Sequence, residues 1–245
     1  MSSTPPADIS PLSKSTQGSS PFAGVTHVFW DLDGTLTDSA PGILNSCEYA
    51  LQHMGVSASR ESLYTFIGPP LLESFTRILG SPDKGREAVE LYREYFSRQG
   101  LFENSVYEGA GQALGTLCEH GFSNVLTTAK PLVFARRILD HFVLTKYFAL
   151  LGGADLHGPL HSKKDVLADN LRRTKAEPSS VLMVGDRLDD IEAAKSLGVR
   201  SCGVLYGYGR PHELDGADVL CQTITDVAGL LTESRASRRQ HSQGV

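Results

Sequence analysis

The chain has 245 residues, a formal net charge of −5 at pH 7, and 40% hydrophobic residues. This length suffices for one large domain, or for one domain with a smaller insertion, and for a sizeable buried core. The composition is typical of a soluble globular protein, and the negative charge gives no general attraction to nucleic acid or anionic lipid. No apolar run reaches the length of a membrane span, so we expect neither nucleic acid nor a membrane as a partner.

The two ends of the chain predict solvated segments. Residues 1–23 are rich in Ser, Pro and Thr, so we expect a disordered lead without the apolar centre of a secretory signal. Residues 233–245 are polar and basic and indicate a solvated tail. The cysteines are scattered without metal-binding spacing, which is typical of free thiols in the cytoplasm. They are Cys47, Cys118, Cys202 and Cys221.

The first structured element ends in acidic residues. Residues 25–30 are β-branched and aromatic and predict a buried strand of a parallel sheet. Asp31 and Asp33 follow at its carboxyl end, where open α/β sheets bind ligands, and two carboxylates on one side favour a cation between them. Gly34 lets the backbone turn and offer N–H groups to an anion. An ordinary turn is the alternative, because Asp-x-Asp-Gly is common in turns.

The next segment, residues 41–105, shows no strand signal and predicts four consecutive helices. We expect them at residues 41–54, 59–66, 70–79 and 82–99. Four helices after a single strand interrupt a simple alternating fold. We therefore interpret residues 41–105 as a helical insertion.

From Gly109 onward, predicted helices and strands alternate. The helices are expected at residues 111–120, 131–142, 163–173 and 189–197. The strands are expected at residues 122–127, 148–152, 181–184 and 201–205. Such alternation predicts an α/β fold, a Rossmann-like parallel sheet with helices on both faces, formed by residues 24–40 and 106–232.

Three further segments place polar residues at the ends of these elements. Thr128 stands between a strand and a helix, where its hydroxyl and free amides suit a phosphate, although an ordinary helix cap is the alternative. Lys163 or Lys164 would offer a cation from a loop, although such pairs are commonly solvated. Asp186 and Asp190 follow an apolar strand, and their oxygens suit Mg²⁺.

Taken in order, the four segments resemble the four motifs of the haloacid dehalogenase superfamily, in its phosphoglycolate phosphatase-like branch. The first is Asp-Leu-Asp-Gly-Thr-Leu-Thr-Asp-Ser, residues 31–39, and the fourth has the form Gly-Asp-x-x-x-Asp, residues 185–190. Alignment on Lys130-Pro131 places the family's hydroxyl residue at Thr128. Lys163 fits the third motif best. The resemblance covers nearly all of residues 24–232.

This resemblance implies a Mg²⁺-dependent phosphatase that works through an aspartyl-phosphate. Asp31 would be the nucleophile, and Asp33 the general acid and base. Mg²⁺ would bind Asp31, the backbone carbonyl of Asp33 and Asp186, with Asp190 acting directly or through water. The phosphate would be held by Gly34, Thr128, Ala129 and Lys163.

The resemblance also implies that the insertion at residues 41–105 is a helical cap over the site. Glu73 and Arg77 in it are candidate substrate-binding residues, although an exposed ion pair explains their spacing more simply. The expected substrate is a small phosphorylated metabolite, such as phosphoglycolate or a nucleoside monophosphate, and the expected assembly is a monomer or homodimer. A phosphomutase and a non-catalytic binding protein on the same fold are the alternatives.

Overall fold

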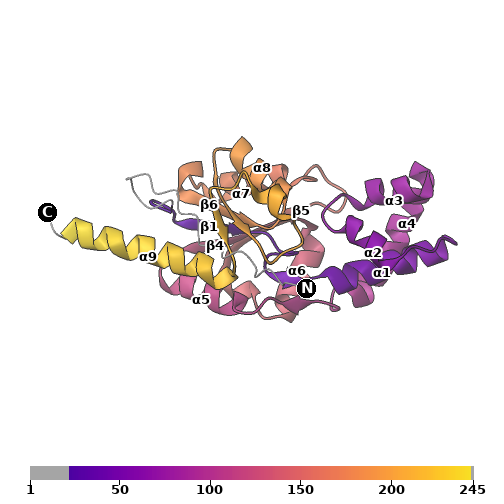
Figure 1. Ribbon diagram of the computed structural model, residues 1–245, viewed down its shortest axis with the longest axis horizontal. Helices are drawn as coiled ribbons and strands as arrows, with labels where there is room; N and C mark the ends of the chain where they lie inside the picture. Colours follow the sequence, from indigo (N-terminus) through magenta and orange to yellow (C-terminus); the bar gives the residue numbers. More distant parts are fainter. Residues whose placement is uncertain (1–21, 244–245) are drawn as a thin grey trace, which may run out of the picture.

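The computed structural model describes residues 22–243, and side chains as far as Ser237. Its centre is a six-stranded parallel sheet in the order β5–β4–β1–β6–β7–β8 (Figure 1). The strands are β1 (His27–Trp30), β4 (Ser123–Pro131), β5 (Phe148–Ala154), β6 (Val181–Gly185), β7 (Arg200–Val204) and β8 (Val219–Cys221). Strand β8 was not predicted from the sequence, because three residues are too few to show a strand's alternation.

Helices cover both faces of the sheet, which confirms the predicted fold class. They are α5 (Ala110–Glu119), α6 (Leu132–His141), α7 (Lys163–Thr174), α8 (Leu188–Ser196) and α9 (Ile224–Gln243). Successive side chains of β1 point to opposite faces. Trp30 packs in the cluster that holds Leu114 of α5 and Val227 of α9, whereas Phe29 packs with Leu167 of α7 and Ala194 of α8.

The helical insertion lies beyond one end of the sheet (Figure 1). Its helices are α1 (Ala40–His53), α2 (Arg60–Leu63), α3 (Leu71–Leu79) and α4 (Pro82–Tyr95), with a 3₁₀ turn at Tyr64–Phe66 and a π turn at Phe96–Gly100. The chain enters and leaves through β2 (Thr37–Asp38) and β3 (Ser105–Val106), which pair antiparallel. The insertion that the sequence predicted at residues 41–105 begins at the second residue of α1 and ends at the first residue of β3.

The ends of the described chain differ from the solvated segments that the sequence suggested. Most of the expected lead, residues 1–21, lies outside the described residues, but Phe22 is buried in the core. Helix α9 continues through the expected start of the tail, where Ser234 is buried and the Arg235 guanidinium lies 4.8 Å from the Phe122 ring centre. A polar segment extends an established helix at little cost, because propagation needs no new nucleus.

The register of the three central strands determines where the polar side chains meet. Trp30 of β1 pairs with Leu126 of β4 on one side and with Val184 of β6 on the other. The residues that follow all three strands therefore emerge at one edge of the sheet. No helix within residues 22–243 is both long enough and apolar enough to cross a membrane.

Candidate active site

Asp31 is the first acidic residue after β1 and is almost fully buried. Its backbone N–H donates to the carbonyl of Val184 at 2.9 Å, so the chain still follows the sheet at this point. Burial raises the pKa of the Asp31 carboxyl, and the charges of Asp33 and Asp189 raise it further, although Lys163 opposes them. The sheet thus holds a carboxylate where water solvates it poorly.

Asp186 follows β6 and faces Asp31 across the strand ends. Its Oδ1 accepts from the Thr35 hydroxyl at 3.2 Å, and its Oδ2 accepts from the backbone N–H groups of Tyr208 and Gly209 at 2.7 and 3.3 Å. Burial, followed by the charge of Asp31, raises the pKa of Asp186 to about 7. These donors fix the side chain, but they do not neutralise its charge.

Gly34 is the residue that permits this close arrangement. Its φ is +84°, a conformation that L side chains rarely adopt. A Cβ atom there would lie 2.3 Å from Oδ2 of Asp186. The glycine of the first motif is therefore needed to seat the aspartate of the fourth.

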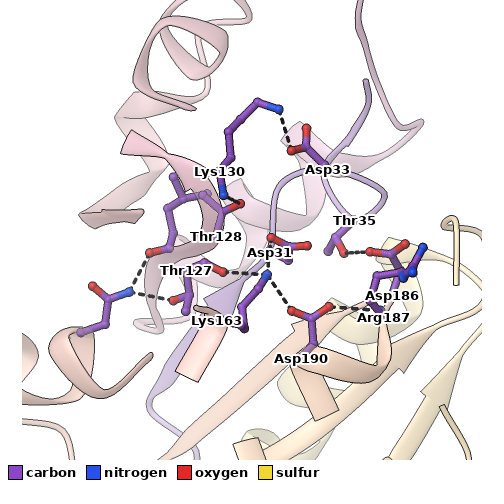
Figure 2. A network of polar contacts seen from close by, with 12 residues as sticks. Asp31, Asp33, Thr35, Thr127, Thr128, Lys130, Lys163, Asp186, Arg187 and Asp190 are labelled. Atoms are coloured by element: carbon purple, nitrogen blue, oxygen red, sulfur yellow. Dashed lines mark hydrogen bonds and ion pairs between the residues drawn. The ribbon is translucent and has the colours of Figure 1, made fainter. Parts of the chain in front are cut away.

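Lys163 is the cation at the centre of the site (Figure 2). Ser162 caps the N-terminus of α7 in a capping box with Asp165, which fixes Lys163 as the first helical residue. The Lys163 ammonium lies 2.5 Å from Asp31 Oδ1 and 2.7 Å from Asp190 Oδ1. Burial alone would lower its pKa, but Asp190 and Asp31 outweigh burial and raise it. The neighbouring Lys164 is exposed, so Lys163 is the lysine that the structure brings to the site.

Asp190 lies at the start of α8 and is fully buried. Its Oδ2 accepts from the Arg187 backbone N–H at 3.1 Å, and its Oδ1 forms the ion pair with Lys163. Burial raises the pKa of this carboxyl well above its usual value. Each oxygen has a partner, so Asp190 positions Lys163 whether or not it also binds a metal.

Thr128 and Ala129, at the end of β4, line the cavity above the carboxylates. Thr127 instead points away from it, because its hydroxyl accepts from the Asn170 amide at 2.9 Å and its carbonyl accepts from Lys163 at 3.3 Å. Of the two adjacent threonines, Thr128 is therefore the one that a phosphate would meet.

Asp33 points towards Lys130, a residue that the sequence analysis used only to align the second motif. The Lys130 ammonium lies 2.7 Å from Asp33 Oδ2, and both side chains are largely buried. A signal was present in the sequence, since Lys130 follows Thr128 by two residues at the same strand end. Thr35 and Tyr208, which hold Asp186 by hydrogen bonds, were likewise not predicted as site residues.

The acidic residues fit a divalent cation. Asp31, Asp186 and Asp190 each offer a carboxylate oxygen, and the three oxygens lie within 4.8 Å of one another. All three residues are buried, and within residues 22–237 Lys163 is the one cation that forms ion pairs with them. An all-oxygen set with excess negative charge is the donor chemistry that Mg²⁺ prefers.

A cavity of about 530 Å³ lies beneath the helical insertion, and Asp31, Asp33 and Lys163 line it. The loop Ile67–Pro70 forms part of its wall, and the Arg187 guanidinium donates to the Ile67 carbonyl at 3.1 Å. Glu73 lines the cavity. Arg77 is exposed one turn further along α3 and is absent from the lining, and within the described part of the chain it forms no ion pair with Glu73. Of the two candidates, only Glu73 reaches the cavity.

A parallel α/β sheet that presents buried carboxylates and a lysine to a covered cavity defines the class of capped hydrolases that act on phosphate groups. This chain belongs to the haloacid dehalogenase-like hydrolase family, which matches residues 28–204. The resemblance drawn from the four motifs is confirmed. So is the enzyme class, a phosphoric monoester hydrolase similar to phosphoglycolate phosphatases.

The relatives differ in their described activities. The tyrosine-protein kinase PtkA of Mycobacterium tuberculosis is 38% identical over 220 residues, covering 89% of this chain and 74% of PtkA. A 5′-nucleotidase of Pseudomonas aeruginosa is 38% identical over 190 residues, covering 77% of this chain and 86% of that enzyme. A phosphoglycolate phosphatase of Escherichia coli O157:H7 is 31% identical, covering 85% and 93%. The structure of a predicted phosphatase from Clostridium acetobutylicum, 37% identical, matches with a TM-score of 0.81 and covers 85% and 99%.

Proposed function

We propose that this protein is a Mg²⁺-dependent phosphatase that hydrolyses a small phosphate monoester through an aspartyl-phosphate. One observation carries the proposal. Asp31 is buried beneath the cavity, paired with Lys163 at 2.5 Å, and its carboxylate lies within 4.8 Å of those of Asp186 and Asp190. Such a carboxylate is ionised and nucleophilic once a cation offsets its neighbours.

In the first step, an Asp31 carboxylate oxygen attacks phosphorus while the bond from phosphorus to the ester oxygen breaks. Asp33 gives its proton to the departing oxygen, which leaves as an alcohol. Bound Mg²⁺ would shield the negative charge of Asp31 from that of the phosphate. Lys163 and the hydroxyl of Thr128 would hold the other phosphate oxygens, where charge collects in the transition state.

In the second step, water hydrolyses the aspartyl-phosphate. Asp33, now a carboxylate, takes a proton from the water as its oxygen attacks phosphorus, and the bond to Asp31 breaks. Inorganic phosphate leaves and both aspartates return to their starting states. Because the insertion covers the cavity, bulk water is kept from the site while the substrate is bound.

The side chains of the cavity wall favour a substrate whose leaving group is uncharged and contains a ring. Every lysine and arginine found in its described lining already has a carboxylate partner. The pairs are Lys130 with Asp33, Lys163 with Asp31 and Asp190, Arg93 with Glu90, and Arg187 with Glu213. A substrate carboxylate would have to break one of them, whereas Phe66, Tyr92 and Phe96 offer aromatic surface. These features favour a nucleoside monophosphate over phosphoglycolate.

All four cysteines are free thiols, which suits the reducing cytoplasm. We place the enzyme there, as a monomer or homodimer that acts on a metabolite and on neither nucleic acid nor a membrane.

The test is phosphate release from a panel of monoesters with Mg²⁺ or with a chelator, compared between wild type and Asp31→Asn. We expect the chelator to abolish release and the substitution to lower kcat by roughly 10⁴-fold or more, because the nucleophile is lost. Acid-quenched samples of wild type should hold covalent phosphate that Asp31→Asn lacks.

Asp83→Asn is the matched control, since it removes an exposed carboxylate on α4 and should leave kcat unchanged. Full activity of a folded Asp31→Asn variant would refute the mechanism. Sugar-phosphate isomerisation without net phosphate release would identify a phosphomutase instead.

A tyrosine kinase is the second candidate, because PtkA is 38% identical over 89% of this chain. The two activities share phosphoryl transfer and differ in the acceptor, which is water for a phosphatase and a tyrosine hydroxyl for a kinase. Incubation with γ-labelled ATP separates them. Label on tyrosine that resists hydroxylamine and alkali, which both cleave an aspartyl-phosphate, would support the kinase. Release of inorganic phosphate from monoesters without such label supports the phosphatase.

A further inference from the structure

We infer that Lys130 is the positioning residue of Asp33, and that it does this only while the helical insertion covers the site. The inference rests on the proposed function, in which Asp33 protonates the leaving group. It assigns a role to a residue that contacts neither the acidic cluster nor Lys163 in any ion pair within the described chain.

The contact between Lys130 and Asp33 gives the two oxygens of the Asp33 carboxyl group different surroundings. Oδ2 accepts from the Lys130 ammonium at 2.7 Å (Figure 2), whereas Oδ1 is buried and has no partner among the described residues. A buried polar atom without a partner is costly, so the ion pair through Oδ2 is what holds the side chain in this conformation. Lys130 thus fixes the rotamer of Asp33 through Oδ2 and leaves Oδ1 to carry the proton.

The ammonium of Lys130 also contacts the insertion. It lies 4.8 Å from the centre of the Phe96 ring, in the π turn that ends α4. Phe96 is itself fixed, because it stacks on Tyr92 at 5.3 Å and meets Phe134 edge-on at 5.5 Å. An aromatic face attracts a cation, and the attraction grows where water is excluded.

Lys130 therefore lies between a carboxylate of the sheet domain and an aromatic ring of the insertion. Only 7% of its side chain is exposed, so Phe96 and its neighbours keep water from the ion pair. If the insertion moved away, water would compete for both the ammonium and Asp33, and the pair would weaken. Covering the cavity and orienting the acid are then one event.

The test exploits the different needs of two leaving groups. An alkoxide, such as that of a nucleoside 5′-monophosphate, needs a proton as it departs, whereas 4-nitrophenolate does not. We expect Lys130→Met to lower kcat/KM for the nucleotide by about 10²-fold, the usual contribution of a general acid. The value for 4-nitrophenyl phosphate should fall by less than about threefold, because phosphoryl transfer to Asp31 is unaffected.

Three companion variants sharpen the result. Lys130→Arg keeps the cation and should restore part of the nucleotide activity. Phe96→Leu keeps apolar volume but removes the π face, and should show the same selective loss to a smaller degree. Lys146→Met is the matched control, since Lys146 also lies over a ring, that of Tyr147 at 5.0 Å, but is absent from the cavity lining.

The outcomes distinguish this inference from the function on which it rests. Equal losses of kcat/KM on both esters would show that Lys130 has a merely structural role. No loss on either ester would show that it has no role. Either result overturns the inference. If Lys130→Met does not fold, Phe96→Leu decides the question by the same ratio. If wild type released no phosphate from either ester with Mg²⁺, the proposed function would fail and the inference with it.

Discussion

Three buried carboxylates and one lysine lie close together beyond the carboxyl ends of β1 and β6. Asp31 and Asp190 both pair with Lys163, whereas Asp186 is held by hydrogen bonds alone among the described residues. The cluster thus has more negative than positive charge in a place where burial leaves the charges poorly solvated. Burial, followed by the charge of Asp31, raises the pKa of Asp186 to about 7, and a divalent cation would relieve the repulsion between the carboxylates.

This imbalance predicts that Mg²⁺ affinity depends on pH. Because the metal needs the carboxylate form, it must displace a proton from Asp186 below pH 7. We expect the apparent Kd for Mg²⁺ to rise by about tenfold per pH unit below that value and to level off above it. Isothermal titration calorimetry measures this Kd. The titrations should span pH 5.5 to 8.5, about 1.5 pH units either side of the expected pKa.

The stability of the metal-free protein gives an independent check that the pKa of Asp186 is raised. Asp186 binds its proton more tightly in the folded state than a solvated aspartate with its ordinary pKa of 3.8, so this group stabilises the fold below about pH 4. That contribution is lost as the pH rises to about 7. The unfolding free energy of wild type relative to Asp186→Asn should fall over this window. A flat difference, together with a pH-independent Kd, would contradict the assignment.

At the scale of the element, loops and helix ends carry the site while strands and helices fix their positions. The cap of α7 is one example. Ser162 Oγ accepts from the Asp165 N–H at 3.1 Å, and Asp165 Oδ2 accepts from the Ser162 N–H at 3.0 Å. These two bonds decide where the helix begins, and therefore where Lys163 projects.

Ser162→Ala should lower the unfolding free energy by about 1 kcal/mol, the usual cost of a lost N-cap. The substitution should also lower kcat several-fold, because Lys163 would then project from a less rigid helix end. Ser59→Ala is the matched control, since Ser59 caps α2 by the same bond but lies far along the chain from Lys163. Chemical denaturation and steady-state kinetics give the two numbers. Equal effects of both variants on kcat would show that the cap of α7 has no special role.

The elements themselves were largely predictable. Periodicity found the helices of the insertion to within a few residues, because an amphipathic helix repeats its pattern over several turns. The exceptions have physical causes. β8 is held by pairing with β7, and the end of α9 by packing of Ser234 and Arg235, and neither contact leaves a periodic trace in the sequence.

At the scale of the whole molecule, the insertion meets the sheet domain through a shared apolar cluster and a few polar contacts such as those of Arg187. Arg187 is central to them. Its Nη1 donates to the Ile67 carbonyl at 3.1 Å, and its Nε lies 3.2 Å from Glu213 Oε2. Figure 1 shows the insertion beyond one end of the sheet, and Arg187 is a polar contact between the two parts.

Arg187→Ala should therefore favour a more open molecule. We expect a several-fold higher KM with a smaller change in kcat, since the reacting groups stay in place, and a larger radius of gyration by small-angle X-ray scattering. Arg86→Ala, which removes an exposed arginine on α4, should change neither. An unchanged KM and radius would show that Arg187 does not hold the insertion.

The sequence by itself determined the chemistry of this protein. Two apolar strands that each end in acidic residues predicted Asp31 and Asp186 as site residues, since the local pattern alone indicates a strand and the residues directly after it. Tertiary structure alone decided which neighbours these residues have. That Lys163 is buried and Lys164 exposed, that Thr128 rather than Thr127 meets the cavity, and that Lys130 reaches Asp33 all result from strand register and helix packing. Such contacts join residues far apart in the chain, and no local pattern records them.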